Sequence, residues 1–502
     1  MADNDAKARS RPPPNILVIV LDCVRAQEFP GGWESPPPMP FVQGLTKESL
    51  TFPRAATTAP WTIPGHASLF TGLYPWEHRA HAHADLALRP PAPTLAERLS
   101  AAGYATGFFA SNGLLMPESG LTRGFQVAAW GGWWERYLRV PCLTYPGAGY
   151  GLPLRRSRGG GALARRMSQE VRLTHRFPMM WDAANRVAAR VRYRREGPMI
   201  SVSSWIEPTI ERWLREVDPS RPVFAFVNLM DAHEPYISNP ELVRGLRAWL
   251  SSLPPRMDWT NLVAGGWAPD DRQAQRYSLL YRGMLEVIDG RLRNLVAVFD
   301  RLGRWDNTVF VLTSDHGQAL GEHGYLFHSA EVWEQLMRIP LLIRDPNAEW
   351  KGGRAKGWAS LVDVAPTLLS MARVPAPPPA DGYDLRRLVD ADRPTPALGM
   401  SDGITEKGLL RRVGATGSIG ERDDLRVVAY QADYKLVLNV ATGASVWYRS
   451  GEGEESPISE AITDERATGA LARAREVASL LSQERPRVAD ATVEDRLRSW
   501  GY

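Results

Sequence analysis

Short runs of apolar and β-branched residues, each followed by polar groups, are the clearest pattern along this chain of 502 residues. The runs NILVIVL (residues 15–21) and VFVLT (309–313) are followed by Asp22 and, after one serine, by Asp315 and His316. Such runs are typical of strands buried on both faces, as in the parallel sheets of α/β proteins. Because open α/β sheets place their active sites at the carboxyl ends of parallel strands, we expect these polar side chains to meet there.

A helix-compatible run begins near Thr62, two residues before Pro64. The Thr62 hydroxyl is therefore predicted at a helix N-terminus, where unpaired amides and the helix dipole favour an anion. With Asp22, Asp315 and His316 it makes an oxygen and nitrogen ligand set suited to a divalent cation. A metal ion in contact with the Thr62 oxygen would lower its pKa and orient it for attack on phosphorus or sulfur.

Two of these residues also have a purely structural interpretation. Asp after an apolar strand is a common turn former, which is the alternative for Asp22. Thr before a helix start that contains proline is a common N-cap, which is the alternative for Thr62.

Several further segments resemble the sulfatase branch of the alkaline phosphatase superfamily, in the order of that family. The resemblance extends from Pro14 to about Ser456 and is carried by TLAERLSAAGYAT at Thr94, GEHGYLFHS at Gly321, RIPLLI at Arg338, VDVAPTLL at Val362, DGYDL at Asp381 and YKLVLN at Tyr434. It implies an α/β fold of the alkaline-phosphatase and sulfatase type. We therefore expect a large, mixed, mostly parallel sheet sandwiched by helices, and a small C-terminal subdomain of a sheet and a helix.

The resemblance also implies roles for the polar residues. It makes Thr62 the nucleophile, and Asp22, Thr62, Asp315 and His316 the metal ligands. One divalent ion is expected, Mn, Zn, Ca or Mg, and a second ion is left open.

Further histidines and one aspartate have family roles. His233, in NLMDAHEPY, is expected to contact an oxyanion or protonate the leaving group. His328 is expected to contact the transferred group or to bind a second metal. His66, Asp231 and His323 are weaker candidates for substrate binding, and His66 and His323 have the alternative of only holding a helix or loop in place.

Departures from the family pattern bear on the chemistry. Thr62 stands where formylglycine sulfatases carry Cys or Ser, and threonine cannot be oxidised to that aldehyde. Threonine nucleophiles of the superfamily occur in phosphodiesterase-like and lipoteichoic-acid-synthase-like branches, which implies phosphoryl chemistry. Cys23 replaces the second of two usual aspartates, and His328 replaces a usual lysine.

The predicted function is a metal-dependent, sulfatase-like hydrolase that cleaves a phosphate or sulfate ester, with phosphate favoured, through a covalent Thr62 intermediate. The alternatives are a phosphoryl-group transferase of the phosphoethanolamine or phosphoglycerol type, and a catalytically inactive binding module. The expected partner is an anionic small molecule or lipid headgroup, and no nucleic acid is expected. The oligomeric state stays open.

Composition sets the domain organisation. With 44% hydrophobic and 23% charged residues, the chain can bury a large core. We expect a polar, disordered leader over residues 1–13, a catalytic domain over 14–390, and a C-terminal subdomain over 391–502. The leader has no apolar signal core and no apolar run approaches twenty residues, so we expect a cytoplasmic protein without a transmembrane segment. Peripheral association with a membrane stays open.

An insertion at about residues 131–197 is not explained by the family pattern. Between Arg155 and Arg195 it carries twelve arginines and two acidic residues, whereas the whole chain has a net charge of only +4. A helix within it would present Arg186, Arg190 and Arg194 beside an apolar stripe. It is interpreted as a solvated helix, a lid over an anionic substrate, or a membrane-surface helix.

Overall fold

The structure is a computed structural model. It describes residues 12–30, 39–81, 84, 87–130, 203–233, 236, 271–329, 331–348, 352–375, 382–391, 393–402, 425–450, 455–459, 462 and 464–483.

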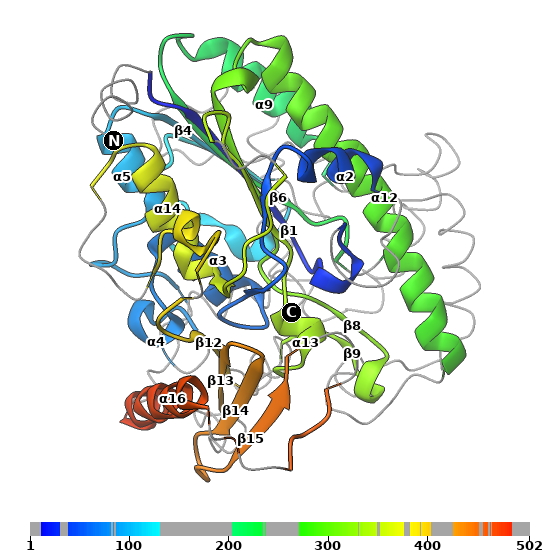
Figure 1. The fold of residues 1–502 in the computed structure, drawn as a ribbon. Helices are drawn as coiled ribbons and strands as arrows, with labels where there is room; N and C mark the ends of the chain where they lie inside the picture. Colours follow the sequence, from blue (N-terminus) through cyan, green and yellow to red (C-terminus); the bar gives the residue numbers. More distant parts are fainter. Residues whose placement is uncertain are drawn as a thin grey trace, which may run out of the picture.

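A mixed, mostly parallel sheet forms the centre of the molecule (Figure 1). Among the described residues its spatial order is β2 (Leu50–Thr51), β10 (Leu341–Arg344), β7 (Thr308–Thr313), β1 (Asn15–Leu21), β6 (Val223–Leu229), β4 (Ala105–Ala110) and β5 (Val127–Trp130). The strands from β7 to β5 are parallel, and β10 runs antiparallel to β7. In the register of the centre, Val18 of β1 pairs with Phe226 on one side and Val311 on the other. This confirms the predicted α/β fold and the two predicted strands.

Helices cover both faces of this sheet, as the alternating side chains of β1 require. Ile16, Val18 and Val20 point to one face and belong to one buried cluster, whereas Leu17 and Ile19 belong to another. The first face is covered by α3 (Thr62–Thr71), α5 (Leu95–Ala101) and α14 (Val364–Met371), and the second by α2 (Pro40–Thr46), α9 (Ile206–Glu216) and α12 (Asp271–Arg301).

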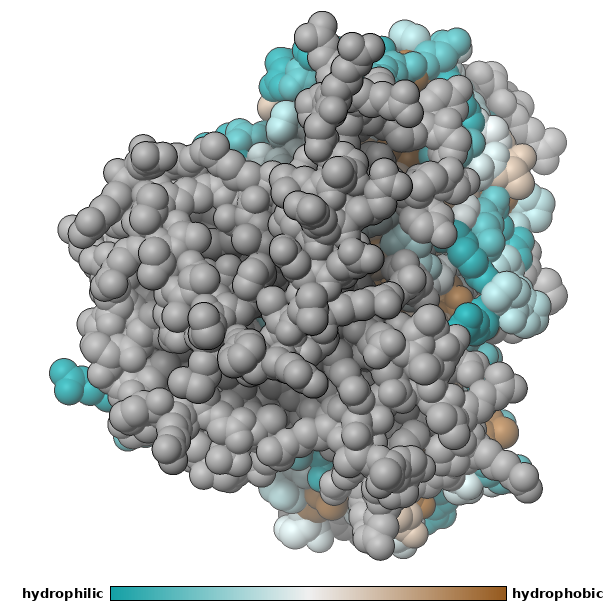
Figure 2. Space-filling view, turned by 180° about the vertical axis from the view of Figure 1, so that it is seen from behind, coloured by the Kyte–Doolittle hydropathy of each residue, from teal (hydrophilic) through white to brown (hydrophobic). Residues whose placement is uncertain are grey.

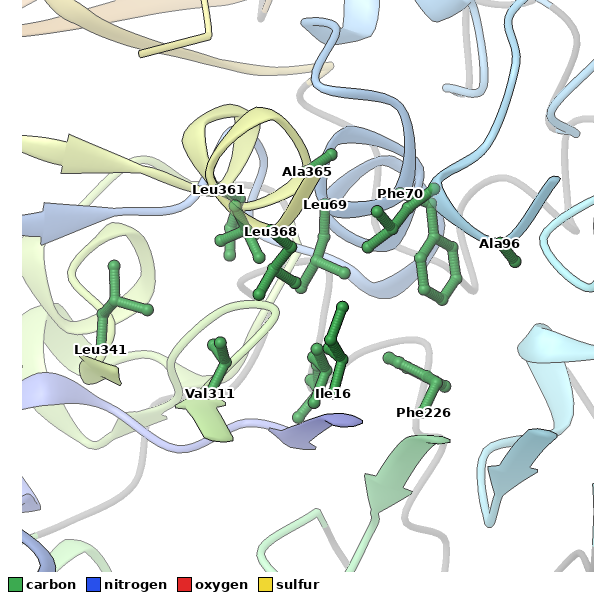
Figure 3. Packing of buried hydrophobic residues seen from close by; sticks show 14 of the residues in the cluster. Ile16, Leu69, Phe70, Ala96, Phe226, Val311, Leu341, Leu361, Ala365 and Leu368 are labelled. Atoms are coloured by element: carbon green, nitrogen blue, oxygen red, sulfur yellow. The ribbon is translucent and has the colours of Figure 1, made fainter. Parts of the chain in front are cut away.

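Large apolar side chains fix α3 against the sheet. Figure 3 shows Leu69 and Phe70 of α3 packed above Ile16 and Phe226, with Leu368 of α14 beside them. The Phe70 and Phe226 rings meet edge to face at 4.7 Å between centroids. Because protein interiors are close-packed, this packing fixes the position of α3, and with it the position of its first turn at the carboxyl ends of the central strands.

Shorter elements complete the main domain. They are η1 (Ala26–Glu28), β3 (Ala55–Ala56), α4 (Pro75–His78), η2 (Gly113–Leu115), η3 (Pro117–Ser119), η4 (Trp305–Asn307), β8 (Ala319–Leu320), η5 (Glu322–Gly324), β9 (Leu326–Phe327), α13 (Glu334–Met337), β11 (Ala359–Ser360), η6 (Leu361–Asp363) and η7 (Leu385–Leu388).

The C-terminal part forms a small antiparallel sheet covered by one helix (Figure 1, orange and red). Its elements are β12 (Ala397–Ser401), β13 (Arg426–Gln431), β14 (Tyr434–Asn439), β15 (Ser445–Arg449) and α16 (Glu465–Gln483). Buried Lys435 of β14 lies 3.4 Å from the carboxylate of Glu334 in the main domain, which also accepts a hydrogen bond from Tyr430. The sheet-and-helix subdomain is thus confirmed, while its boundary after residue 390 stays a prediction.

Several predictions lie outside the described residues. These are residues 1–11 of the predicted leader, the insertion at about 131–197 with its arginine-bearing helix, and Cys142. The part of the chain that the structure describes contains no helix with the length and hydrophobicity needed to cross a membrane. On the face seen in Figure 2, the coloured residues are mainly hydrophilic, with scattered apolar side chains.

Candidate active site

The carboxyl ends of four parallel strands bring polar residues together. Asp22 follows β1, Asn112 follows β4, His233 follows β6, and Asp315 and His316 follow β7. All five side chains are buried. The strand order β7-β1-β6-β4 makes these ends neighbours, which is the place where open α/β sheets bind ligands.

Thr62 reaches this cluster from α3. It is the first residue of the helix, after the N-cap Trp61, and it is fully buried. The side-chain amide of Asn112 donates to Asp22 Oδ2 at 2.7 Å and to Thr62 Oγ1 at 3.4 Å. One NH₂ group therefore links the predicted nucleophile to the predicted ligand on β1.

The two asparagines around Asp22 were not identified in the sequence analysis. The Asn112 side chain is held in place by a hydrogen bond from the Leu114 backbone amide to its Oδ1 at 2.8 Å. Asn228, inside β6, donates to Asp22 Oδ2 at 3.1 Å. The available signal was a polar residue in or just after an apolar run, with Asn112 two residues after ATGFFA and Asn228 within VFAFVNL.

Asp315 and His316 carry buried atoms that lack hydrogen-bond partners. Asp315 Oδ1 accepts from the backbone amides of His316, at 3.0 Å, and Cys23, at 3.4 Å. Asp315 Oδ2 and His316 Nε2 lie 3.3 Å apart, and neither has a hydrogen-bond partner among the described residues. His316 Nδ1 lies 2.9 Å from the Gly317 carbonyl, so the tautomer protonated on Nδ1 leaves a lone pair on Nε2.

The first turn of α3 lies directly against the Asp315 backbone. A methyl group built on Gly65 would come within 2.8 Å of the Asp315 carbonyl oxygen, so only glycine allows this approach. One turn of helix on from Thr62, His66 Nδ1 lies 2.8 Å from the Thr62 carbonyl and 3.5 Å from Asp315 Oδ2. His66 thus touches both the helix start and the β7 loop.

The pKa values of Asp22 and Asp315 are shifted in opposite directions. Burial raises the pKa of Asp22, but His233, His316 and the Asn112 hydrogen bond outweigh it and lower that pKa to about 2. Burial and the charge of Asp22 raise the pKa of Asp315 well above its ordinary value. In the absence of a cation, Asp22 is therefore the charged carboxylate.

His316 and His66 are held in their neutral form. Burial and the nearby His328 lower the pKa of His316 well below its ordinary value. Burial also lowers the pKa of His66 to about 4. Neutral imidazoles offer lone pairs, which is the form in which histidine binds a metal.

A second group of side chains faces the first. His328 has its ring centroid 4.4 Å from that of His316 and 5.1 Å from that of His233. Its Nδ1 lies 2.9 Å from Gln318 Oε1 and 3.6 Å from Cys23 Sγ. The structure therefore places both predicted catalytic histidines beside the predicted ligands.

The weaker substrate-binding candidates are placed differently. Asp231 is buried in the turn after β6, next to the cluster in sequence. His323 is exposed and its ring stacks on Trp333 at 4.5 Å between centroids. That position fits the alternative in which His323 only holds its loop in place.

The residues present fit a divalent cation. Potential ligand atoms form two groups, and within each group they all lie within 4.8 Å of one another. One group comprises Asp22, Cys23 and His316, and the other comprises Cys23, His233 and His328. A cation would also satisfy the buried Asp315 Oδ2 and His316 Nε2 atoms.

Comparisons with known proteins agree with the arrangement. The model of the Sulfatase family matches residues 14–374. The multifunctional alkaline phosphatase superfamily protein PehA of Trinickia caryophylli is 24% identical over 425 residues, covering 76% of this chain and 78% of that protein. An arylsulfatase of Clostridium perfringens (strain 13 / Type A) is 23% identical over 403 residues, covering 75% and 78%. The crystal structure of a phosphonate monoester hydrolase of Agrobacterium radiobacter has the same fold, with a TM-score of 0.60 at 20% identity, over 94% of this chain and 96% of that one.

Proposed function

This chain belongs to the sulfatase family of the alkaline phosphatase superfamily, and we propose that it is a metal-dependent hydrolase of phosphate esters with Thr62 as nucleophile. Enzymes of this family generally depend on a divalent ion. The observation that carries the proposal is that the Asn112 side-chain amide donates hydrogen bonds to both Thr62 Oγ1 and Asp22 Oδ2 at the N-terminus of α3. A hydroxyl and a carboxylate held by one donor can contact the same cation.

Phosphate is favoured over sulfate by the nucleophile. Formylglycine is made from cysteine or serine, and threonine at position 62 cannot become that aldehyde. A threonine hydroxyl can still form a phosphoester. The name of the PehA relative, which describes it as multifunctional, is compatible with a site that accepts more than one ester class.

Asp22, Asp315 and His316 would hold the ion, and Thr62 would complete the ligand set. When bound, a divalent ion lowers the pKa of a neighbouring hydroxyl and neutralises charge on the transferred group. The N-terminus of α3 adds unpaired amides and the positive end of its dipole to the same place.

Thr62 then carries the transferred group. After its hydroxyl proton is lost to water, Oγ1 bonds to phosphorus, and the bond from phosphorus to the leaving oxygen breaks. His233, buried beside His328, gives its proton to that leaving oxygen. Water next attacks the phosphothreonine, His233 accepts its proton, and Oγ1 is released and regains a proton from water, so the sum is an alcohol and a phosphate.

A panel of substrates tests the proposal. Purified full-length protein, supplied in turn with Mn, Zn, Mg or Ca, is assayed on aryl phosphate monoesters, diesters, phosphonates and sulfates. We expect turnover of a phosphorus ester and its loss on chelation. Turnover of sulfates alone contradicts the preference for phosphorus, and activity that survives chelation contradicts metal dependence. Added acceptor alcohols separate hydrolysis from group transfer, because a transferase yields a new phosphoester.

A further inference from the structure

The side chain common to both groups of potential ligands is Cys23. Its sulfur lies 3.4 Å from Asp22 Oδ1 and 3.6 Å from His328 Nδ1. It shares one set of ligand atoms with Asp22 and His316, and the other with His233 and His328. A cation held by either group would therefore be within reach of the thiol.

The backbone holds Cys23 in an unusual conformation. Its φ of 64° lies in the left-handed region, which is unfavourable for a residue with a Cβ. Three contacts fix that conformation. The carbonyl accepts from the Tyr281 hydroxyl at 2.9 Å, the amide points at Asp315 Oδ1 at 3.4 Å, and the next amide, of Val24, donates to the Ser314 hydroxyl at 3.0 Å. A strained residue fixed from three sides at a cluster of ionisable groups suggests function more than packing.

The surroundings of the thiol argue against a simple packing role. A buried cysteine that only fills space behaves as a small apolar side chain. Cys23 Sγ instead contacts a carboxylate and an imidazole. A second observation does not depend on the thiol. His316 Nε2 and Asp315 Oδ2 lie 3.3 Å apart in the same cluster, and both are buried without hydrogen-bond partners among the described residues.

We propose that Cys23 is a thiolate ligand of the metal ion, and that the site for this reason selects a thiophilic divalent ion such as Zn²⁺ over Mg²⁺ or Ca²⁺. This inference rests on the metal site of the proposed function and specifies its ion. Thiolate and imidazole ligands suit zinc, whereas Mg²⁺ and Ca²⁺ take oxygen ligands. Cys23 thus changes the ion, while Asp22, Asp315, His316 and Thr62 supply the oxygen and nitrogen ligands.

Cobalt replacement gives a readout that does not depend on turnover. Full-length protein freed of metal and loaded with one equivalent of Co²⁺ should show a near-ultraviolet sulfur-to-cobalt charge-transfer band. Cys23→Ser should abolish the band and lower zinc affinity by more than the roughly 10- to 100-fold typical of groups that only support a ligand. Cys142→Ser is the matched control, because it removes the other thiol of the chain and should leave the band unchanged.

Metal competition provides the second measurement. Protein equilibrated with equal Zn²⁺ and Mg²⁺ or Ca²⁺ is analysed for bound elements, and zinc should dominate in the wild type. Cys23→Asp should shift the bound metal toward Mg²⁺ or Ca²⁺. Circular dichroism melts of the metal-free variants check folding, and if Cys23→Ser does not fold, wild-type and Cys23→Asp data decide alone.

The results separate this inference from the proposed function. A wild-type protein that takes up cobalt without the band, keeps the band in Cys23→Ser, or prefers Mg²⁺ or Ca²⁺ overturns the role of Cys23, even if phosphate esters are hydrolysed. Failure to take up any divalent ion overturns both. A zinc protein with the cobalt band that hydrolyses no ester overturns only the proposed function.

Discussion

Replacing Asn112 with alanine tests whether a residue that does no chemistry sets up the site. The change removes the donor to Asp22 Oδ2 at 2.7 Å and to Thr62 Oγ1 at 3.4 Å. A hydrogen bond to a charged group contributes about 1.5–3 kcal/mol. Asn228 still donates to Asp22 Oδ2 at 3.1 Å, so part of this contribution is retained.

The expected loss follows from these contacts. If the full 1.5–3 kcal/mol were lost in the transition state, kcat/KM would fall roughly 10- to 150-fold, and retention of the Asn228 bond favours the lower part of that range. Roughly 10- to 100-fold is also typical when a partner that orients a metal ligand is removed. The Leu114 amide loses its acceptor as well, so we expect an additional decrease of about 1 kcal/mol in the free energy of unfolding.

Asn112→Asp is the sharper variant. It keeps the size of the side chain but replaces the donor with a carboxylate beside Asp22, whose own pKa is about 2. Two like charges at hydrogen-bond distance should raise the pKa of Asp22 and decrease activity more than alanine does.

The assay is kcat/KM on the best phosphorus ester of the panel, with metal content and urea unfolding measured in parallel. Asn307→Ala is the matched control, because its side-chain amide lies away from the site and donates to the exposed backbone of Pro13 at 3.2 Å. Activity of Asn112→Ala equal to that of Asn307→Ala would refute the reasoning. So would an aspartate variant more active than the alanine variant.

Three further predictions concern other parts of the molecule. Thr62→Ala should lower turnover by several orders of magnitude and Thr62→Ser should keep part of it, measured on the same ester, and an alanine variant within about tenfold of wild type contradicts covalent catalysis. Asp315→Asn should lose bound metal in elemental analysis without unfolding, because β7 itself is apolar, and unchanged metal content would exclude Asp315 as a ligand. Burial lowers the pKa of His78 from 6.5 to about 3, so the unfolded chain binds an extra proton between these values. The free energy of unfolding should therefore fall as pH falls through that window, by up to about 1.4 kcal/mol per pH unit. His78→Gln should flatten this slope in urea titrations of metal-free protein, and an equal slope in both proteins would refute it.

Much of the fold could be predicted from local patterns. The strands at 15–21 and 309–313 and the sheet-and-helix C-terminal part are confirmed, because apolar runs between turn residues determine such elements locally. The order of the strands is not local. Neighbouring strands can lie far apart along the chain, as where Asn15 of β1 pairs with Thr308 of β7.

The candidate site could be predicted only where residues follow a strand or match a family motif. The structure gathers Asp22, Thr62, Asp315 and His316, although their roles stay predictions. Asn112 was missed because its importance arises only when β4 lies beside β6 and aims the amide at Asp22. The same holds for Cys23, which the sequence analysis treated as the loss of a ligand, whereas its sulfur lies among the candidate ligands.

Gly65 lets two parts of the site that are 250 residues apart in the chain, the start of α3 and the loop after β7, come into direct backbone contact. One face of α3 packs against the Asp315 carbonyl, and this close approach is possible because Gly65 has no Cβ. The missing Cβ therefore sets the distance between the proposed nucleophile Thr62 and the proposed ligand Asp315. A methyl group at position 65 would move Thr62 relative to Asp315 by a few tenths of an ångström or more, while every functional group of the site stays chemically unchanged. Gly65→Ala is therefore a geometric probe, able to show how much of the rate depends on distance alone.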